Sequence, residues 1–280
     1  MDLTYSSGID NLVAKHIKGN VARVGGSVDQ LMNYKNNIVV HDINILDGGF
    51  GSIRSVTQAN NWFDVKKIFL RKLKQEIKHI LYGDRVSLDR KTTELDMHFA
   101  QRNVTLHHKF DCSISSNVIE HTPNAIFMLL NFHLITKDDG WMFHALPNHR
   151  FTYDRFRSPT PLSHFIDDFE SHQTFSDDTH VQDYIQSAIE KDGWQKTFHE
   201  IFPVAYPFMH FHVFDEENVK ALFSFVFEDV TCDLIRNDHF SDNLVICRNR
   251  LNGNFVAQYG ELIREVSSGY YLSTMEKNVK

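Results

Sequence analysis

Cysteine is scarce in this chain, and its distribution argues against two kinds of site. Only Cys112, Cys232 and Cys247 occur among the 280 residues. None belongs to a CxxC pair and their number is odd, so we expect neither a disulfide framework nor a cysteine-ligated metal site. Isolated, inert thiols are typical of a reducing compartment. We therefore expect a cytoplasmic protein.

Long apolar runs and excess positive charge are also missing. No stretch approaches the roughly 18 apolar residues that a membrane span requires, and residues 1–20 lack the apolar segment of a signal peptide. The formal net charge is −7, which argues against nucleic acid as the main partner because phosphates bind basic surfaces. No internal repeat or low-complexity linker divides the chain. We expect a single domain over residues 1–280.

Phenylalanine and histidine, by contrast, are abundant, with 23 and 17 copies. Phenylalanine supplies apolar area for a core, and 42% of the residues are hydrophobic, so a sizeable core is expected. Histidine can bind metals, transfer protons or occupy a polar surface. The last of these is the plain interpretation of most of the 17.

Short apolar runs alternate with helical patterns in the first two thirds of the chain. The runs that predict strands are 21–24, 38–41, 112–115 and 141–145. Between the last two, residues 125–135 have helical spacing and no breaker. A strand, a helix and a further strand form the crossover unit of a parallel sheet. The pattern predicts a doubly wound α/β fold with a mostly parallel sheet.

The C-terminal third predicts a different local arrangement. Residues 216–227 have the pattern of a helix, and two strands follow over 230–235 and 243–247. The strands are close enough in sequence to pair as an antiparallel hairpin. The predicted sheet therefore ends in a C-terminal antiparallel hairpin.

Two stretches exceed a minimal sheet. Residues 43–85 predict a helical insertion with a basic helix over 65–82, whose charges indicate a solvated face; contact with acidic lipid at a membrane surface, or with phosphate, is the alternative. Residues 148–209 are polar, aromatic and rich in histidine. Insertions at the carboxyl ends of parallel strands often form the substrate site, so we expect 148–209 to be a substrate or lid region.

A glycine turn and a later carboxylate suggest a nucleotide-type cofactor. The first predicted strand runs into Gly25, Gly26 and Ser27, and the second is followed by Asp42, which could accept ribose hydroxyls. Such features also occur for structural reasons alone. Residues 46–51 (LDGGFG) offer a competing glycine loop, but no strand ending in an acid follows them at the right distance.

The longest motif spans residues 110–169. Residues 110–121 (FDCSISSNVIEH) and 134–147 resemble the FDxxxSxHVIEH…LxxGGxLxxxVP region of class I S-adenosylmethionine-dependent methyltransferases. The continuation to Asp168 resembles PxKRxTFDxxRPxTPLxHxxxD, found in a branch of predicted sugar and cell-surface polysaccharide methyltransferases. Residues 210–214 resemble the HFHVF of that branch. The resemblance implies a Rossmann-like fold and O-methylation of a sugar or glycan hydroxyl in polysaccharide biosynthesis.

The resemblance also implies S-adenosyl-L-methionine as the cofactor. The implied contacts are Gly25, Gly26 and Ser27 beneath the cofactor, Asp42 at its ribose, Asp89 at its adenine, and Ser116 and Asn117 at its methionine end. The sequence departs from the family in its short glycine loop, in Asn117 where the branch often has histidine, and in Asp139 where a turn usually has glycine. A catalytically degenerate methyltransferase fold that binds or scaffolds is therefore the alternative, and another nucleotide-dependent enzyme such as a dehydrogenase is the weaker one.

Methyl transfer to a hydroxyl requires in-line placement and a base. The candidate bases are His164 and Asp154, followed by His121 and His144. The candidate substrate ligands are Arg157, Thr160, Asp168, His210 and His212.

One histidine pattern suggests a metal as an alternative. His164, Asp168 and His172 would share one face of a helix, and with His210 and His212 they could surround a divalent ion. A hydrogen-bonded helix face explains the same spacing, so no metal is expected. Glu120 and His121 could likewise cap the helix that follows them.

Overall fold

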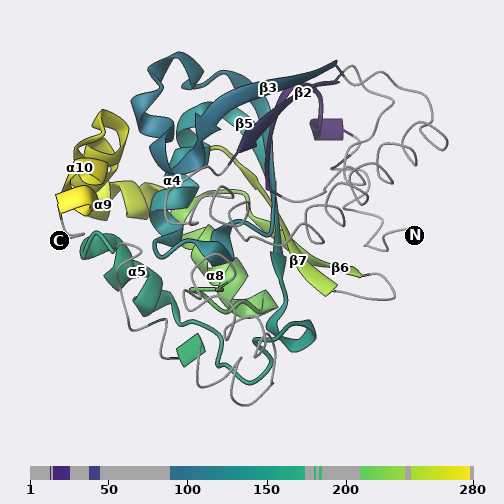
Figure 1. The fold of residues 1–280 in the computed structure, drawn as a ribbon, viewed down its shortest axis with the longest axis vertical. Helices are drawn as coiled ribbons and strands as arrows, with labels where there is room; N and C mark the ends of the chain where they lie inside the picture. The colour runs from purple at the N-terminus through teal and green to yellow at the C-terminus, as the bar shows by residue number, and fades with distance from the viewer. Residues whose placement is uncertain are drawn as a thin grey trace, which may run out of the picture.

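The structure, a computed structural model, describes residues 13, 15–25, 38–44, 89–173, 180, 183–184, 209–236 and 241–277. These residues form one seven-stranded sheet in the order β3-β2-β1-β4-β5-β7-β6, with helices packed against it (Figure 1). The strands are β1 Gly19–Gly25, β2 Ile38–Asn44, β3 Asp89–Asp96, β4 Phe110–Ser116, β5 Thr136–Pro147, β6 Thr231–Arg236 and β7 Ser241–Arg248.

The sheet has the Rossmann-like topology that the sequence predicted. Strands β1 to β5 are parallel, and their order 3-2-1-4-5 matches that of doubly wound dinucleotide-binding sheets. Strand β7 runs antiparallel to both β5 and β6, so the C-terminal hairpin is confirmed. Parallel strands bring their carboxyl ends to one edge, which is where ligands bind in this kind of sheet.

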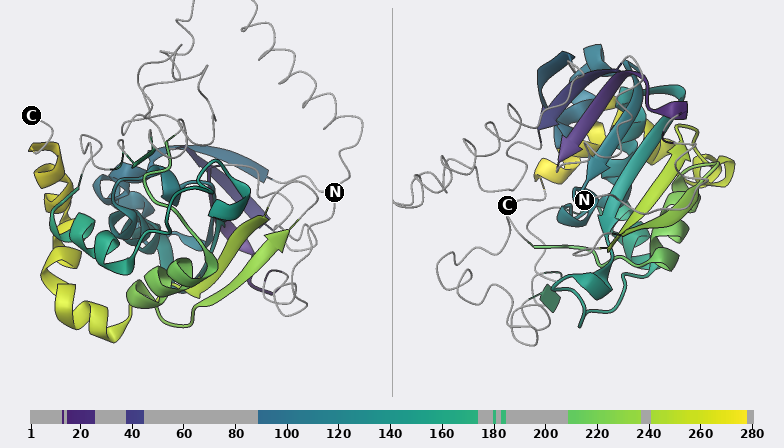
Figure 2. Two further views of the ribbon diagram at one scale, coloured as in Figure 1. Left: turned by 90° about the horizontal axis from the view of Figure 1, so that it is seen from below. Right: turned by 90° about the vertical axis from the view of Figure 1, so that its right-hand side faces the viewer.

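Within the described residues, the helices lie mainly on one face of the sheet (Figures 1 and 2). They are α4 Ala125–Ile135, α5 Leu162–Glu170, α8 Glu216–Val226, α9 Gly253–Ser268 and α10 Tyr270–Lys277, with short 3-10 turns η2 Met97–Arg102, η3 Val104–Leu106, η4 Ile119–His121 and η5 His149–Phe151. Helix α4 has the predicted bounds. Its N-cap is Asn124, whose side chain accepts a hydrogen bond from the Phe127 amide, rather than Glu120 or His121.

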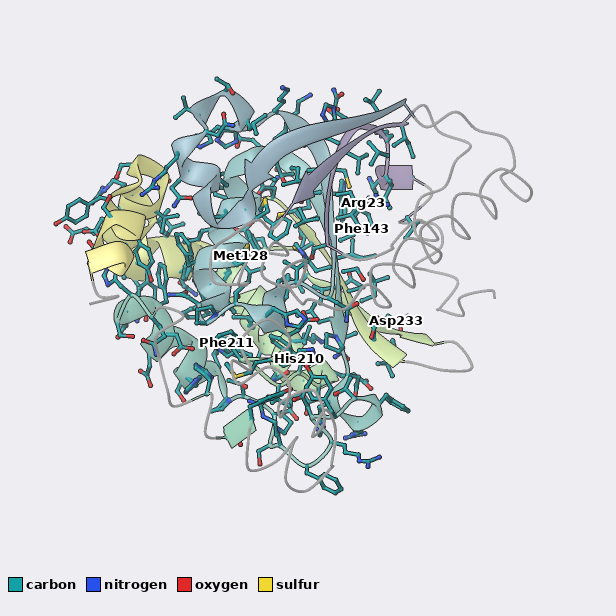
Figure 3. All side chains as sticks on the ribbon, in the orientation of Figure 1. Arg23, Met128, Phe143, His210, Phe211 and Asp233 are labelled. Atoms are coloured by element: carbon teal, nitrogen blue, oxygen red, sulfur yellow. The ribbon has the colours of Figure 1, made fainter. Side chains whose placement is uncertain are left out.

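Two apolar cores cover the two faces of the sheet. The larger one joins α4, α5, α8 and α9 to the sheet and contains Met128 and Phe223. The smaller one lies on the opposite face around Val21, Ile114 and Phe143. Figure 3 labels Met128 and Phe143 on opposite sides of the sheet, and the right panel of Figure 2 looks onto one face with α9 and α10 behind it. Helix α4 is buried almost all round, which explains its continuous apolar sequence.

Several strand bounds differ from the prediction. Strand β2 continues to Asn44, so Asp42 lies within the strand instead of after it. Strand β3 was not predicted because it is polar (DRKTTELD). Among the described residues it is an edge strand that pairs with β2 alone, and an edge strand needs no apolar run. Strand β5 begins at Thr136, and Asp139 adopts a left-handed φ of 58° at the position where the family has glycine.

Some predictions lie outside the described residues. Only residues 43 and 44 of the predicted 43–85 insertion are described, and both belong to β2. Of 148–209, the structure describes η5, α5 and a few further residues, so the lid assignment stays a prediction. In the part of the chain that is described, no helix is long and apolar enough to cross a membrane.

Candidate active site

The carboxyl ends of β1 and β4 bring predicted cofactor residues together. Gly25 ends β1 and pairs in register with Ser116, which ends β4. Asn117 follows at once, and its amide donates to the Ala145 carbonyl of β5 at 3.0 Å. Gly26 and Ser27 lie outside the described residues. Three of the predicted cofactor contacts, Gly25, Ser116 and Asn117, therefore meet at the ligand-binding edge of the sheet.

Gly25 is required by the close approach of these two strand ends. Its φ is +85°, and a Cβ placed there would lie 2.4 Å from Val118 Cγ2 and 2.6 Å from the Ser116 carbonyl oxygen. Only glycine combines this backbone conformation with that approach. Asn117 also has a left-handed φ, of 54°, and its Oδ1 accepts from the Ser116 hydroxyl at 2.9 Å. The turn after β4 is thus packed tightly against the end of β1.

Residues 42 and 89, the two predicted acidic contacts of the cofactor, lie toward opposite ends of the parallel strands. Residue 42 lies in β2 opposite residue 23 of β1, close to the carboxyl ends. Residue 89 begins β3 opposite residue 39, toward the amino ends of the strands. The side chains of Asp42 and Asp89 are outside the described set. The contact of Asp42 with ribose and that of Asp89 with adenine stay predictions. The position of residue 89 lends no support to its contact with adenine.

Asp154 lies at the centre of a buried polar cluster beyond the ends of β4 and β5. Its Oδ2 accepts from His210 Nδ1 at 2.5 Å, and its Oδ1 accepts from Arg157 Nη1 at 2.8 Å. Burial alone would raise the pKa of Asp154, but His210 and Arg157 outweigh it and hold that pKa below its usual value. Asp154 is therefore a carboxylate, and His210 carries its proton on Nδ1 when neutral.

Arg157 holds this cluster in place. Its Nη1 also donates to the His210 carbonyl at 2.7 Å and its Nη2 to the Phe211 carbonyl at 3.3 Å. Its Nε donates to Asp183 Oδ2 at 2.6 Å. The guanidinium is buried and makes all these contacts within the protein. The role predicted for Arg157 as a substrate ligand stays a prediction.

His121 and Glu120 of η4 flank the same cluster. The His121 ring lies edge-on to that of His210, 4.7 Å between centroids, and its Nδ1 donates to the Met209 carbonyl at 3.0 Å. Burial, then the neighbouring His210, lower the pKa of His121 to about 3. Burial raises the pKa of Glu120 to about 8. At neutral pH His121 is unprotonated with its lone pair on Nε2, and Glu120 is a neutral acid.

His164 belongs to a second cluster, together with Asp168 of α5, His180 and His212. His212 Nε2 lies 2.9 Å from Asp168 Oδ2, and His164 Nε2 lies 3.3 Å from His180 Nε2. Burial would raise the pKa of Asp168, but hydrogen bonds from His180 and His212 lower it to about 2. The structure thus separates the predicted bases: Asp154 and His121 share one cluster, and His164 lies in the other.

Thr160 connects these residues to α8. Its hydroxyl accepts from the Val213 amide at 2.9 Å, and its carbonyl accepts from Asn218 Nδ2 at 2.9 Å. The Phe211 amide also donates to the Glu120 carbonyl at 2.7 Å. These bonds fix residues 209–213, and the bend at residues 211 and 212 places His210 in one cluster and His212 in the other. Figure 3 shows His210 beside Phe211 at the end of the molecule near α5 and α8.

Two further histidines lie elsewhere. His144 of β5 is fully buried between Phe132 and Phe223, with Nδ1 2.7 Å from the Ser115 hydroxyl. His172 follows the end of α5 and stacks on Tyr271, ring centroids 4.2 Å apart. The helix ends at Glu170, so His172 does not continue the face of His164 and Asp168.

Two members of the clusters were missed. His180 and Asp183 lie in a stretch without periodicity or motif, and they meet their partners only through the fold. Glu120 stands in the VIEH motif, where the sequence alone suggested a helix cap. Its place among apolar residues directly after a strand was the signal that sequence reasoning could have used.

Comparison with known proteins gives similarity in solved structures only. No protein-family model matches the chain, and no curated protein sequence matches it. It is similar to the CurJ carbon methyltransferase (14% identity, 84% of this chain and 49% of that one, TM-score 0.41). It is also similar to a 1,6-didemethyltoxoflavin-N1-methyltransferase from Burkholderia thailandensis (8% identity, 87% of this chain and 77% of that one, TM-score 0.44).

A third similar structure is a SAM-dependent methyltransferase from Methanosarcina mazei (9% identity, 90% of this chain and 100% of that one, TM-score 0.42). The chain covers about half the length of the three carbon methyltransferase structures it matches, 49%, 48% and 47%. At such identities no substrate is assigned to this chain.

Proposed function

We propose that this chain is an S-adenosylmethionine-dependent methyltransferase that O-methylates a sugar or glycan hydroxyl. The observation that carries the proposal is the buried Asp154–His210 pair at the carboxyl edge of a Rossmann-like sheet, directly beyond the strand ends that hold Gly25 and Asn117. Methyl transfer to a hydroxyl requires a base beside the bound cofactor, and this pair lies beside the edge of the sheet where a cofactor would bind.

The turn around Gly25 suits the cofactor. A side chain at this position would clash with Val118 and the Ser116 carbonyl, so glycine is required at the turn where the family resemblance places the cofactor. Asn117 is exposed at the same turn. When bound, S-adenosylmethionine supplies an electrophilic methyl group. Gly25, Ser116 and Asn117 would hold it, together with Gly26, Ser27 and Asp42 by the family resemblance.

His210 is the best base that this cluster offers. The Asp154 carboxylate can only accept at His210 Nδ1, so the neutral ring carries its lone pair on Nε2. The carboxylate also stabilises the imidazolium that forms when Nε2 takes the proton of an acceptor hydroxyl, as in other acid–histidine pairs. In this scheme Asp154 orients and stabilises, and Arg157 positions Asp154.

The hydrogen-bond donors and acceptors of this cluster match the hydroxyl groups of an uncharged sugar. His210 Nε2 offers a lone pair to a hydroxyl, while Glu120 is a neutral acid that can donate. Arg157, the natural ligand for a phosphate or carboxylate, is engaged by Asp154, Asp183 and two carbonyls. These features support a sugar hydroxyl as the acceptor.

Calorimetry with S-adenosylmethionine and S-adenosylhomocysteine tests the cofactor. We expect binding in the sub-millimolar range by the full chain, and its loss in Asp42→Ala. If Asp42→Ala binds normally, the glycine loop is misassigned and residues 46–51 become the candidate. If the folded wild-type chain binds neither compound, the catalytic proposal fails and a degenerate fold is left.

A panel of acceptors tests the substrate class. Free sugars, nucleotide-linked sugars and oligosaccharides are incubated with S-adenosylmethionine, and formation of S-adenosylhomocysteine is measured. We expect turnover with at least one carbohydrate and a role in polysaccharide biosynthesis in the cytoplasm. Turnover confined to amines or carbon acids would overturn the O-methylation proposal while keeping the cofactor.

A further inference from the structure

The second cluster brings three imidazoles and one carboxylate to a single point. Helix α5 places His164 and Asp168 one turn apart on the same face, with His164 Nε2 and Asp168 Oδ2 3.5 Å apart. His180 Nε2 lies 3.3 Å from His164 Nε2 and 3.8 Å from Asp168 Oδ1. His212 Nε2 lies 2.9 Å from Asp168 Oδ2. All three imidazoles thus contribute the same ring atom, Nε2.

The spacing matches the ligand shell of a tetrahedral metal. Ligand atoms bound at about 2.0–2.1 Å from a tetrahedral ion stand about 3.3–3.4 Å from one another. Of the four separations above, 3.3, 3.5 and 3.8 Å are close to this edge length, the last of them measured to the second Asp168 oxygen. All four groups can offer one ligand atom within 4.8 Å of the rest. An ion could enter with small adjustments of side chains.

The tautomer of His180 is fixed by its other nitrogen. His180 Nδ1 lies 2.9 Å from the Phe211 carbonyl oxygen, which can only accept, so Nδ1 must carry the proton. A bound ion would take the lone pair of Nε2, in place of the proton that hydrogen-bonds Asp168 when His180 is charged. An imidazole that donates from Nδ1 to a backbone carbonyl and presents Nε2 is the arrangement found in metal-binding histidines.

Charge favours a cation at this point. Asp168 is a largely buried carboxylate, and among the described residues it forms ion pairs with His164, His180 and His212 and not with lysine or arginine. His164 is the partly exposed member, at 38% of its side chain, while the other three are nearly buried. The cluster is therefore open to solvent on one side, which gives an ion a route of entry.

We propose that His164, Asp168, His180 and His212 form a binding site for a divalent transition metal, with Zn²⁺ as the best match to three imidazoles and one carboxylate. The site joins α5 to residue 180 and to the 209–213 segment. Its role is to fix that segment, and it is independent of the proposed methyl transfer. The cluster of Glu120, His121 and His210 belongs instead to the proposed acceptor site.

Metal binding by the untagged full chain tests the proposal. The protein is stripped with a chelator, dialysed, and titrated with Zn²⁺, with Co²⁺ as a spectroscopic probe. We expect one equivalent per chain, visible absorption typical of tetrahedral Co²⁺ bound through nitrogen and oxygen, and a raised Tm. The titration reaches about 1 mM metal, which corresponds to the weakest specific affinities. If the folded chain then binds less than about one tenth of an equivalent, the proposal is overturned.

Variants assign the ligands. Residues that merely orient a metal ligand are worth roughly 10–100-fold in affinity, so His180→Gln and Asp168→Asn should weaken Zn²⁺ binding by about 100-fold or more. His172→Gln is the matched control, since His172 lies beside α5 but stacks on Tyr271, and it should bind as the wild type does. If either core variant fails to fold, His164→Gln, at the exposed ligand, supplies the same comparison. Equal affinity in His164→Gln and His172→Gln would overturn the assignment.

Discussion

Two partners of the Asp154 carboxylate, His210 and Arg157, predict different effects of removing its charge. Asp154→Asn keeps the shape but removes the charge that orients and stabilises His210. We expect kcat to fall by roughly 10²–10⁴-fold, the usual contribution of general acid–base catalysis, with S-adenosylmethionine affinity unchanged in calorimetry. Because Arg157 also loses its buried partner, a lower Tm should accompany the effect.

Two further variants separate the effect on catalysis from the lowered stability expected for Asp154→Asn. His210→Gln leaves the Asp154–Arg157 ion pair in place and should reduce kcat as strongly. Asp183→Asn, at the half-exposed partner of Arg157 Nε, should leave kcat within about threefold, because exposed partners contribute about 1 kcal/mol or less. A normal rate in His210→Gln would remove His210 as the base.

Gly25 provides a test of the strand-end geometry. Gly25→Ala forces a Cβ into contact with Val118 and the Ser116 carbonyl at φ +85°. We expect a loss of about 1–3 kcal/mol in the free energy of unfolding, the usual cost of such strain, and loss of cofactor binding. The control is Gly260→Ala in α9, where a Cβ would meet nothing within 4 Å; it should stabilise the helix by about 0.5–1 kcal/mol. Denaturant titration measures both, and an unchanged Gly25→Ala midpoint would contradict the assignment.

The residue types of both clusters could be predicted, but their pairing could not. Asp154, His164, Asp168, His210 and His212 were all recognised from motifs. Asp154 meets His210 across 56 residues and Asp168 meets His212 across 44. No local spacing encodes such contacts, because they depend on how the chain between 170 and 209 returns to the sheet.

At the scale of elements, Asn124 joins three helices. Its Oδ1 caps α4, and its Nδ2 donates to the Asp168 carbonyl of α5 and to the Tyr271 hydroxyl of α10, each at 2.9 Å. Asn124→Ala should lower the free energy of unfolding by about 2–3 kcal/mol, combining a lost cap with two unmade buried hydrogen bonds. Asn252→Ala, at the less buried cap of α9, removes a cap and one partly buried hydrogen bond to the Ser224 carbonyl, and should cost less, about 1–2 kcal/mol. Equal losses in denaturant titration would mean that the two buried bonds of Asn124 add nothing to its cap.

Elements with strong local signals were predicted, and those fixed by tertiary packing were not. Helix α4 and the β6–β7 hairpin follow from uninterrupted apolar patterns. Strand β3 has a polar sequence at a sheet edge, and α9 contains Gly253 and Gly260, which weaken a helical pattern. Helix α9 is held by Phe255 and Tyr259 packed on Phe169, a contact invisible along the chain.

At the scale of the whole molecule, buried neutral histidines make stability depend on pH. Burial lowers the pKa of His144 to about 3 from an ordinary value of 6.5. Below pH 6.5 the unfolded chain takes up a proton at this residue and the folded chain does not, so stability is lost as the pH falls toward 3. The loss is about 1.4 kcal/mol per pH unit from this group.

His144→Leu should remove that part of the slope. Between pH 6 and pH 4 the wild type should lose about 1.4 kcal/mol per unit more than the variant, as measured by denaturant titration at each pH. Above pH 7 the difference between the two should be constant. Parallel curves across the acid range would show that His144 is protonated in the folded chain.

The Phe211 carbonyl oxygen accepts from both His180 Nδ1 and Arg157 Nη2. One acceptor therefore serves both clusters, and each donor polarises the bond that the other uses. Removing the two donors together should not give the sum of the separate losses. In a double-mutant cycle on Arg157→Lys and His180→Gln we expect a coupling energy of about 0.5–3 kcal/mol. A substitution in the Asp154 cluster will thus change the effect of a substitution in the His164 cluster. Such variants should be characterised in pairs.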